Sequence, residues 1–142
     1  MTVLVVDDTS ILRKILSDIL FEYCNIPRHN VHEAADGVQA LREYKRHQPD
    51  VVFLDIAMPK LNGKDAVKLL LKIDPDAKVV MCTGEGSRGM VRECIQAGAK
   101  DYLVKPLQPI RVIEAFDKMM GTGYAAKYKR DHAVNSGQKV KA

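Results

Sequence analysis

Short apolar runs alternate five times with amphipathic segments, and this alternation restricts the fold more than any other feature of the chain. The most apolar runs are residues 3–6, 51–54 and 79–82. Runs of this kind are typical of strands buried on both faces, and helices between them favour a parallel sheet covered on both sides. Because crossovers between parallel strands are right-handed, the sequence predicts a doubly wound α/β fold.

The periodicity of apolar residues also predicts where the elements lie. Helices are expected after the first strand, with Thr9 or Ser10 available as N-cap, and then over residues 37–47, 63–73, 88–97 and 109–120. Weaker strands are expected near residues 30–35 and 101–104. In the first helix, apolar residues recur at helical spacing at Ile11, Leu12, Ile15, Leu16, Ile19 and Leu20. Over residues 37–47, one face carries Val38, Leu41 and Tyr44, and in the last helix Ile110, Ile113 and Phe116 are expected to face inward.

Composition excludes several classes of protein. A length of 142 residues with 46% apolar residues suits one domain with an ordinary core. The odd number of cysteines, without a CxxC pair, favours a reduced cytoplasmic protein, with Cys82 as a small buried apolar residue. No apolar stretch approaches the ~20 residues of a membrane span, and no signal-peptide pattern opens the chain. The histidines have no spacing typical of metal ligands.

The net positive charge of the chain comes from its C-terminal segment. Residues 1–121 carry 17 basic and 17 acidic side chains, whereas residues 122–142 carry five basic and one acidic. We therefore expect a domain over residues 1–121 and a basic tail over 122–142, flexible or partly helical, with a helical turn or two near residues 124–129 before it frays. The tail is the only candidate for contact with nucleic acid, and it is too short for a helix-turn-helix domain.

Polar and charged residues stand where four of the expected strands end. Asp7 and Asp8 follow the first strand, Asp55 the third, Thr83 the fourth and Lys105 the fifth. Ligands of open α/β sheets bind beyond the carboxyl ends of the strands, so we expect these side chains to converge. Any one of them alone would be an ordinary turn or cap residue. Their occurrence at the same end of successive strands predicts a site for a divalent cation and a phosphoryl group.

The chemistry of these groups agrees with that prediction. Mg²⁺ prefers oxygen ligands and takes one or two carboxylates together with water and phosphate oxygens. A carboxylate can also attack phosphorus and form an aspartyl phosphate. The added phosphoryl oxygens then need a hydroxyl and a cation as partners, which Thr83 and Lys105 could supply. Such chemistry depends mainly on positioning and charge neutralisation.

In four stretches the chain resembles the response-regulator receiver domains of two-component signalling. These are VLVVDDTSILR with Asp7, Asp8 and Arg13; LDIAMPKLNG with Asp55, Met58, Pro59 and Gly63; MCTGEG with Thr83; and AGAKDYLVKP with Tyr102, Lys105 and Pro106. The resemblance covers residues 1 to about 120 and implies a flavodoxin-like (βα)5 fold with strand order 2-1-3-4-5.

The resemblance also implies a role for each matching residue. Asp55 would accept a phosphoryl group from a sensor histidine kinase or a small donor such as acetyl phosphate. Lys105 would pair with that group and Thr83 would hydrogen-bond it, while Tyr102 would be the switch aromatic. Mg²⁺ would be held by Asp7, Asp8, Asp55 and the backbone carbonyl of Ala57. The Lys105-Pro106 peptide would be cis.

Three positions bear on how the switch is tuned in the family. Gly84 follows Thr83 where the family more often has alanine, which adds backbone freedom to that loop. Ala57 and Glu85, two residues after Asp55 and Thr83, occupy positions that tune dephosphorylation. Their net effect on the lifetime of the phosphoryl group does not follow from the sequence.

The predicted function is a phosphorylation switch and not an enzyme that turns over an external substrate, although it would catalyse its own phosphorylation and dephosphorylation. Phosphorylation would alter the face of the fourth helix, fifth strand and fifth helix, and so control a protein partner. The expected residues of that face are Arg88, Met90, Val91, Arg111 and Val112. Chemotaxis and relay within a phosphotransfer chain are both open as the pathway.

Two other classes of function fit less well. A phosphatase of the haloacid-dehalogenase type also uses an aspartate nucleophile with Mg²⁺, but that family has Asp-x-Asp at the first strand, whereas Asp7 and Asp8 are adjacent and Ala57 stands two after Asp55. A flavodoxin-like cofactor binder would need a phosphate-binding loop after the first strand, and neither GxGxxG nor GxxxxGK[ST] stands at that position.

Overall fold

The computed structural model describes residues 1–84, 86 and 88–141, with residues 134–141 described by their backbone alone. The strands are β1 (Val3–Val6), β2 (Val31–Ala34), β3 (Val51–Asp55), β4 (Val79–Thr83) and β5 (Asp101–Val104). The helices are α1 (Ser10–Tyr23), α2 (Gly37–His47), α3 (Gly63–Ile73), α4 (Arg88–Ala97), α5 (Pro109–Met120) and α6 (Tyr124–Lys141), with a short 3-10 turn, η1, at Arg28–Asn30. The predicted α/β architecture is confirmed.

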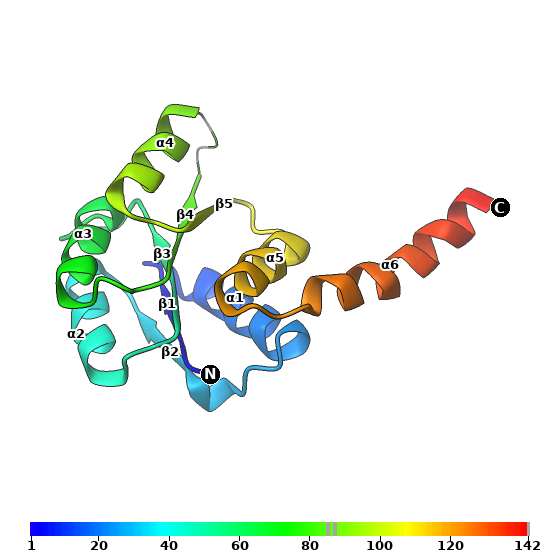
Figure 1. Ribbon diagram of the computed structural model, residues 1–142, viewed down its shortest axis with the longest axis horizontal. Coiled ribbons are helices and arrows are strands. Elements are labelled where there is room, and N and C mark those ends of the chain that lie inside the picture. Colours follow the sequence, from blue (N-terminus) through cyan, green and yellow to red (C-terminus); the bar gives the residue numbers. More distant parts are fainter. Residues whose placement is uncertain (85, 87, 142) are drawn as a thin grey trace.

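All five strands are parallel and pair in the order β2-β1-β3-β4-β5, so β2 and β5 form the edges of the sheet. In Figure 1, α2, α3 and α4 lie on one side of the sheet, while α1 and α5 lie on the other. The central strands are buried along their whole length, as their apolar runs predict. The order that the resemblance implied is therefore the observed order.

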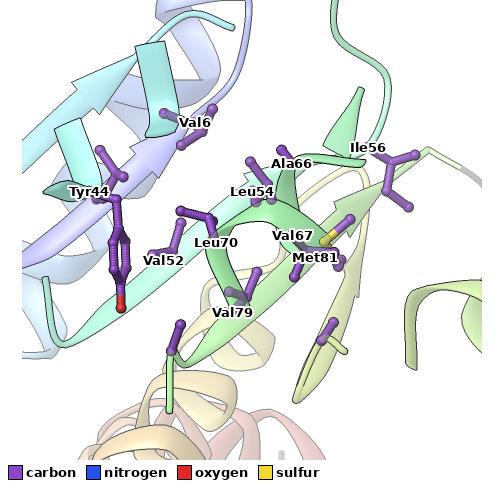
Figure 2. Packing of buried hydrophobic residues seen from close by; sticks show 14 of the residues in the cluster. Val6, Tyr44, Val52, Leu54, Ile56, Ala66, Val67, Leu70, Val79 and Met81 are labelled. Atoms are coloured by element: carbon purple, nitrogen blue, oxygen red, sulfur yellow. The ribbon is translucent and has the colours of Figure 1, made fainter. Parts of the chain in front are cut away.

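Alternating residues of the central strands β1, β3 and β4 supply two separate cores. On one face of the sheet, Val52 and Leu54 of β3 pack with Leu70 of α3 (Figure 2). On the other face, Phe53 of β3 packs in a cluster with Phe116 of α5. Both aromatic side chains are fully buried. The two cores fix β3 from both sides, and with it the position of the carboxylate at its end.

Three residues of the apolar patterns of the first two helices are exposed. Ile11 and Ile15 of α1 are 72% and 38% exposed, whereas Leu16, Ile19 and Leu20 of the same helix are buried. The apolar stripe of α1 is therefore wider than the surface that it packs against. Val38 of α2 is also exposed, since it lies six positions before the buried Tyr44 and about 120° around the helix from it.

Val112 does not belong to the predicted partner face. Its side chain is fully buried and belongs to the core beneath α5. It shares one face of the helix with Ala115, Phe116 and Met119, which follow it at spacings of three, four and seven residues. Val112 therefore cannot contact a partner, whereas its neighbour Arg111 is exposed.

The segment after α5 forms a longer helix than predicted. Gly121 ends α5 in a left-handed conformation, with φ of 69°. The carboxylate of Asp117 then accepts hydrogen bonds from Thr122 Oγ1 (2.6 Å), Tyr124 N (3.0 Å) and Ala125 N (2.8 Å). This caps the start of α6, whose backbone N–H groups would otherwise lack partners. The predicted turn near residues 124–129 is confirmed, but the helix continues to Lys141, past the point where fraying was expected.

The first two turns of α6 pack on the domain, and the remainder extends away from it (Figure 1). Tyr124, Ala125 and Tyr128 are half-buried against the core beneath α1 and α5. The ring of Tyr128 meets the edge of Tyr23, at the end of α1, with 5.0 Å between ring centroids. The start of α6 is thus attached to two helices of the domain.

Substituting Asp117 with alanine should detach the start of α6. Losing a capping carboxylate is expected to lower the free energy of unfolding by about 1–2 kcal/mol and to reduce the helical signal in far-UV circular dichroism. Urea denaturation followed at 222 nm would measure both. Asp131→Ala, which removes an exposed aspartate from α6 itself, is the control. Equal stability of the two variants would show that Asp117 does not hold this helix.

Two smaller expectations also concern the fold. Cys24, Cys82 and Cys94 are free and buried, so the prediction of unpaired cysteines is confirmed. Within the part of the chain that the structure describes, no helix has the length and apolar character needed to cross a membrane.

Candidate functional site

The ends of the parallel strands bring the predicted residues to one edge of the sheet. Asp7 and Asp8 follow β1, Asp55 is the last residue of β3, Thr83 is the last of β4, and Lys105 follows β5. Oxygen atoms of the three carboxylates lie within 4.8 Å of one another. Asp7 and Asp55 are each only 2% exposed, while Asp8 is exposed. The predicted acidic cluster is therefore present, with one member open to solvent.

Lys105 links the two buried carboxylates. Its Nζ lies 3.1 Å from Asp7 Oδ2 and 3.2 Å from Asp55 Oδ1. Its backbone N donates to the carbonyl oxygen of Thr83 at 2.7 Å, which fixes the chain where β4 and β5 end. The Lys105-Pro106 peptide is cis, as the resemblance implied. The buried Thr83 thus lies on the strand beside β3, one residue after Cys82, which pairs with Asp55, and its carbonyl joins it to Lys105.

Thr9 has a role that sequence reasoning missed. It occupies the N-cap position of α1 but makes no side-chain capping bond. Instead, its backbone N and its hydroxyl both donate to Asp7 Oδ1, each at 2.9 Å. An aspartate that accepts from the residue two positions later forms a local turn, and this spacing is the signal that could have revealed the contact. Asp7 therefore has partners on both oxygens, Thr9 on one and Lys105 on the other.

Burial, hydrogen bonds and charges in the cluster together shift the pKa values of Asp55 and Asp7 in opposite directions. Burial raises the pKa of the Asp55 carboxyl, and the charge of Asp7 adds to this, while Lys105 offsets part of it. Burial also acts to raise the pKa of Asp7, but hydrogen bonds from Thr9 and Lys105 outweigh it and leave the pKa below its usual value. Burial would lower the pKa of Lys105, yet both carboxylates outweigh it and raise the pKa. Lys105 therefore offsets only part of the negative charge of the carboxylates.

A divalent cation fits this donor set. Three carboxylates face the ammonium group of Lys105, which leaves an excess of negative charge, and burial together with the charge of Asp7 disfavours the ionised form of Asp55 by raising its pKa. A bound cation would relieve that repulsion. Carboxylate oxygens are the ligands that hard cations such as Mg²⁺ prefer. Asp7, Asp8 and Asp55 can therefore hold a metal ion at this edge.

Gly63 allows the first turn of α3 to approach the end of β3. Its backbone N donates to Ile56 O at 2.8 Å. A Cβ at this position would clash with the backbone carbonyl of Asp55 and with the Cα of Ile56. The glycine that the LDIAMPKLNG motif contains is thus a close-packing residue beneath the acidic site.

Tyr102 lies on the same edge strand as Lys105 but does not belong to the acidic cluster. It pairs in register with Met81, two positions before the pairing of Thr83 with Val104. Its side chain is half-buried, and its backbone O accepts from Arg111 at 3.1 Å.

Ala57 is exposed and donates its backbone N–H to Asp55 Oδ1 at 3.2 Å. Glu85 lies outside the described residues.

The chain is similar to proteins of known function and structure. Residues 3–117 match the family model of the response regulator receiver domain. The chain is 46% identical over 117 residues to the chemotaxis protein CheY of Thermotoga maritima, covering 82% of this chain and 95% of that protein. Over 122 residues it is 43% identical to the chemotaxis protein CheY of Bacillus subtilis, covering 83% and 96%. The crystal structure of the CheX-CheY-BeF3-Mg+2 complex from Borrelia burgdorferi matches with a TM-score of 0.76 at 32% identity, covering 84% and 89%.

Proposed function

We propose a function that starts from one premise: the chain belongs to the response regulator receiver family. Members of this family are signalling switches and not enzymes that turn over an external substrate. We assign Asp55 as the residue that accepts a phosphoryl group. One observation carries this assignment, namely the position of Asp55 Oδ1 3.2 Å from Lys105 Nζ and beside two further carboxylates.

Phosphoryl transfer would proceed by nucleophilic attack of an Asp55 carboxylate oxygen on phosphorus. The new bond joins that oxygen to phosphorus as the bond from phosphorus to the donor breaks. The electron pair of the broken bond stays with the donor, which is an imidazole nitrogen of a sensor histidine kinase or the acetate oxygen of acetyl phosphate. Lys105, whose Nζ contacts both Asp7 and Asp55, would neutralise charge on the transferred group. The Thr83 hydroxyl would donate a hydrogen bond to it.

Asp7, Asp8 and Asp55, with the backbone carbonyl of Ala57, would hold Mg²⁺. When bound, the ion would offset the negative charge of the carboxylates and of the phosphoryl oxygens. The similar CheX-CheY complex from Borrelia burgdorferi contains BeF3 and Mg+2, which supports this choice of metal.

The switch would act on a protein partner through the face formed by α4, β5 and α5. Movement of Thr83 toward the phosphoryl group and of Tyr102 inward would bias this face between two arrangements. Arg88 and Arg111 are exposed there, and Met90 and Val91 are half-buried. Val104 of β5, which is 40% exposed, is a further apolar residue of this face that sequence reasoning missed.

We place this activity in the cytoplasm and in chemotaxis, because two relatives with more than 40% identity are named chemotaxis proteins. A sensor histidine kinase would supply the phosphoryl group. We take residues 1–121 as the receiver domain and residues 122–142 as a basic extension. The family match supports this division, since it ends at residue 117.

Labelling with acetyl phosphate tests the proposed function. Protein incubated with radiolabelled acetyl phosphate should incorporate label with Mg²⁺, should lose that ability in EDTA, and should release the label when treated with hydroxylamine, which cleaves acyl phosphates. Equal labelling in EDTA would contradict the metal requirement, and label that resists hydroxylamine would contradict an aspartyl phosphate. Sustained hydrolysis of phosphate monoesters would instead identify a phosphatase.

A further inference from the structure

Arg13 belongs to the VLVVDDTSILR motif, but neither the proposed phosphoryl transfer nor the metal ligands give it a role. Its Nη1 donates to the backbone carbonyl oxygen of Asp7 at 2.7 Å. Its Nε donates to Glu33 Oε1 at 2.9 Å. The Arg13 side chain is only 18% exposed, so the guanidinium is fixed between the loop after β1 and the edge strand β2.

The contact with the Asp7 carbonyl is important because of the peptide unit in which it lies. That carbonyl is part of the peptide bond between Asp7 and Asp8, and a peptide unit is planar. Fixing the carbonyl oxygen therefore restricts the direction in which the backbone enters Asp8. The side chain of Asp7 is already fixed by Thr9 and Lys105, whereas Asp8 is exposed. Hydrogen bonds from Thr9 and Lys105 thus orient the Asp7 side chain, whereas the direction of the exposed Asp8 depends on the backbone.

We infer that Arg13 is a positioning residue for the metal site: it holds the Asp7–Asp8 peptide in the orientation that directs Asp8 toward the ion, and Glu33 holds Arg13 in place. This inference rests on the proposed Mg²⁺ site. Groups that orient metal ligands without touching the metal typically change metal affinity by about ten- to a hundredfold when removed.

The sign of the effect separates positioning from simple electrostatics. Arg13 is a cation beside a cation site, so its charge alone repels Mg²⁺. If charge were its only influence, Arg13→Ala would tighten Mg²⁺ binding. If Arg13 positions Asp8, the same substitution should weaken binding by about tenfold, despite the loss of the repelling charge.

The experiment is a titration of each variant with MgCl2 alone, followed by amide chemical shifts, so that no phosphoryl donor enters. We expect Arg13→Ala to raise the Kd for Mg²⁺ about tenfold. Arg13→Lys, which keeps the charge but loses the two-armed guanidinium, should also raise it. Glu33→Gln should change the Kd less than Arg13→Ala, because an amide oxygen can still accept from Arg13 Nε. Lys14→Ala removes an exposed cation that pairs with Asp18 on the same helix and should not weaken binding.

A Kd for Arg13→Ala equal to or lower than that of the wild type would overturn the inference. So would full retention of Mg²⁺ affinity in Arg13→Lys, because the two contacts of the guanidinium would then not be what positions the Asp7–Asp8 peptide. The amide spectrum of each variant before titration shows whether it is folded, and Arg13→Lys keeps the test valid if Arg13→Ala does not fold. Absence of Mg²⁺ binding in the wild type would instead contradict the proposed function.

Discussion

Replacing Asp55 with asparagine is expected to reduce phosphoryl incorporation from acetyl phosphate to background. The amide of asparagine has no anionic oxygen with which to attack phosphorus, whereas the carboxylate of Asp55 is the proposed nucleophile. Incorporation of radiolabel in the presence of Mg²⁺ measures the effect. The outcome depends on a single group, and for that reason this is the largest change predicted for the protein.

The Asp55→Asn variant should also remain folded. Burial and the charge of Asp7 raise the pKa of Asp55, so the stability associated with this group is present at low pH and is lost as pH rises through the raised pKa. A neutral amide avoids that loss near pH 7, and the variant should unfold at no lower temperature than the wild type. Asp50→Asn is the control, because Asp50 precedes the same strand at its opposite end. Equal labelling of Asp55→Asn and wild type would remove Asp55 as the acceptor.

Replacing Lys105 with methionine should change stability and metal binding in opposite directions. Without Mg²⁺, the variant leaves Asp7 and Asp55 buried without their ammonium partner. Removing one member of a buried ion pair costs about 3–5 kcal/mol, and because the Lys105 side chain is 23% exposed we expect a smaller loss of about 2 kcal/mol. Mg²⁺ should then bind more tightly than in the wild type, because a competing cation is gone.

Thermal unfolding with and without MgCl2 would measure both effects of Lys105→Met. The midpoint temperature should fall in the absence of the ion and should rise more on its addition than in the wild type. Lys100→Met, at an exposed lysine just before β5, is the control and should leave both values unchanged. A variant as stable as the wild type without Mg²⁺ would show that repulsion between the carboxylates is weak.

The arrangement of the strands was predictable because the evidence for it is local. The apolar runs identified the three central strands, and polar residues at their ends identified the edge of the sheet where the site lies. The resemblance supplied the strand order, which apolar periodicity alone does not determine. The predicted bounds of α2, α3, α4 and α5 agree with the observed ones.

The errors arose where one helix face had to be distinguished from its neighbour. An apolar stripe indicates that a helix packs, but it does not give the width of the surface that receives it, so Ile11, Ile15 and Val38 belong to the apolar patterns and are nevertheless exposed. Conversely, Val112 was expected at the surface and is buried. The start of α6 is capped by Asp117 of α5, a contact between two helices that no periodicity reveals.

The composition of the outer strands bears on how the folded protein behaves in concentrated solution. An edge strand with unpaired backbone groups can recruit a strand from another molecule and begin aggregation. Here β2 and β5 are only four residues long, and β2 carries the charged Glu33, which pairs with Arg13 of α1. The more apolar strands β1, β3 and β4, which would form intermolecular sheets most readily, lie between them. Association of that kind therefore requires the sheet to open first.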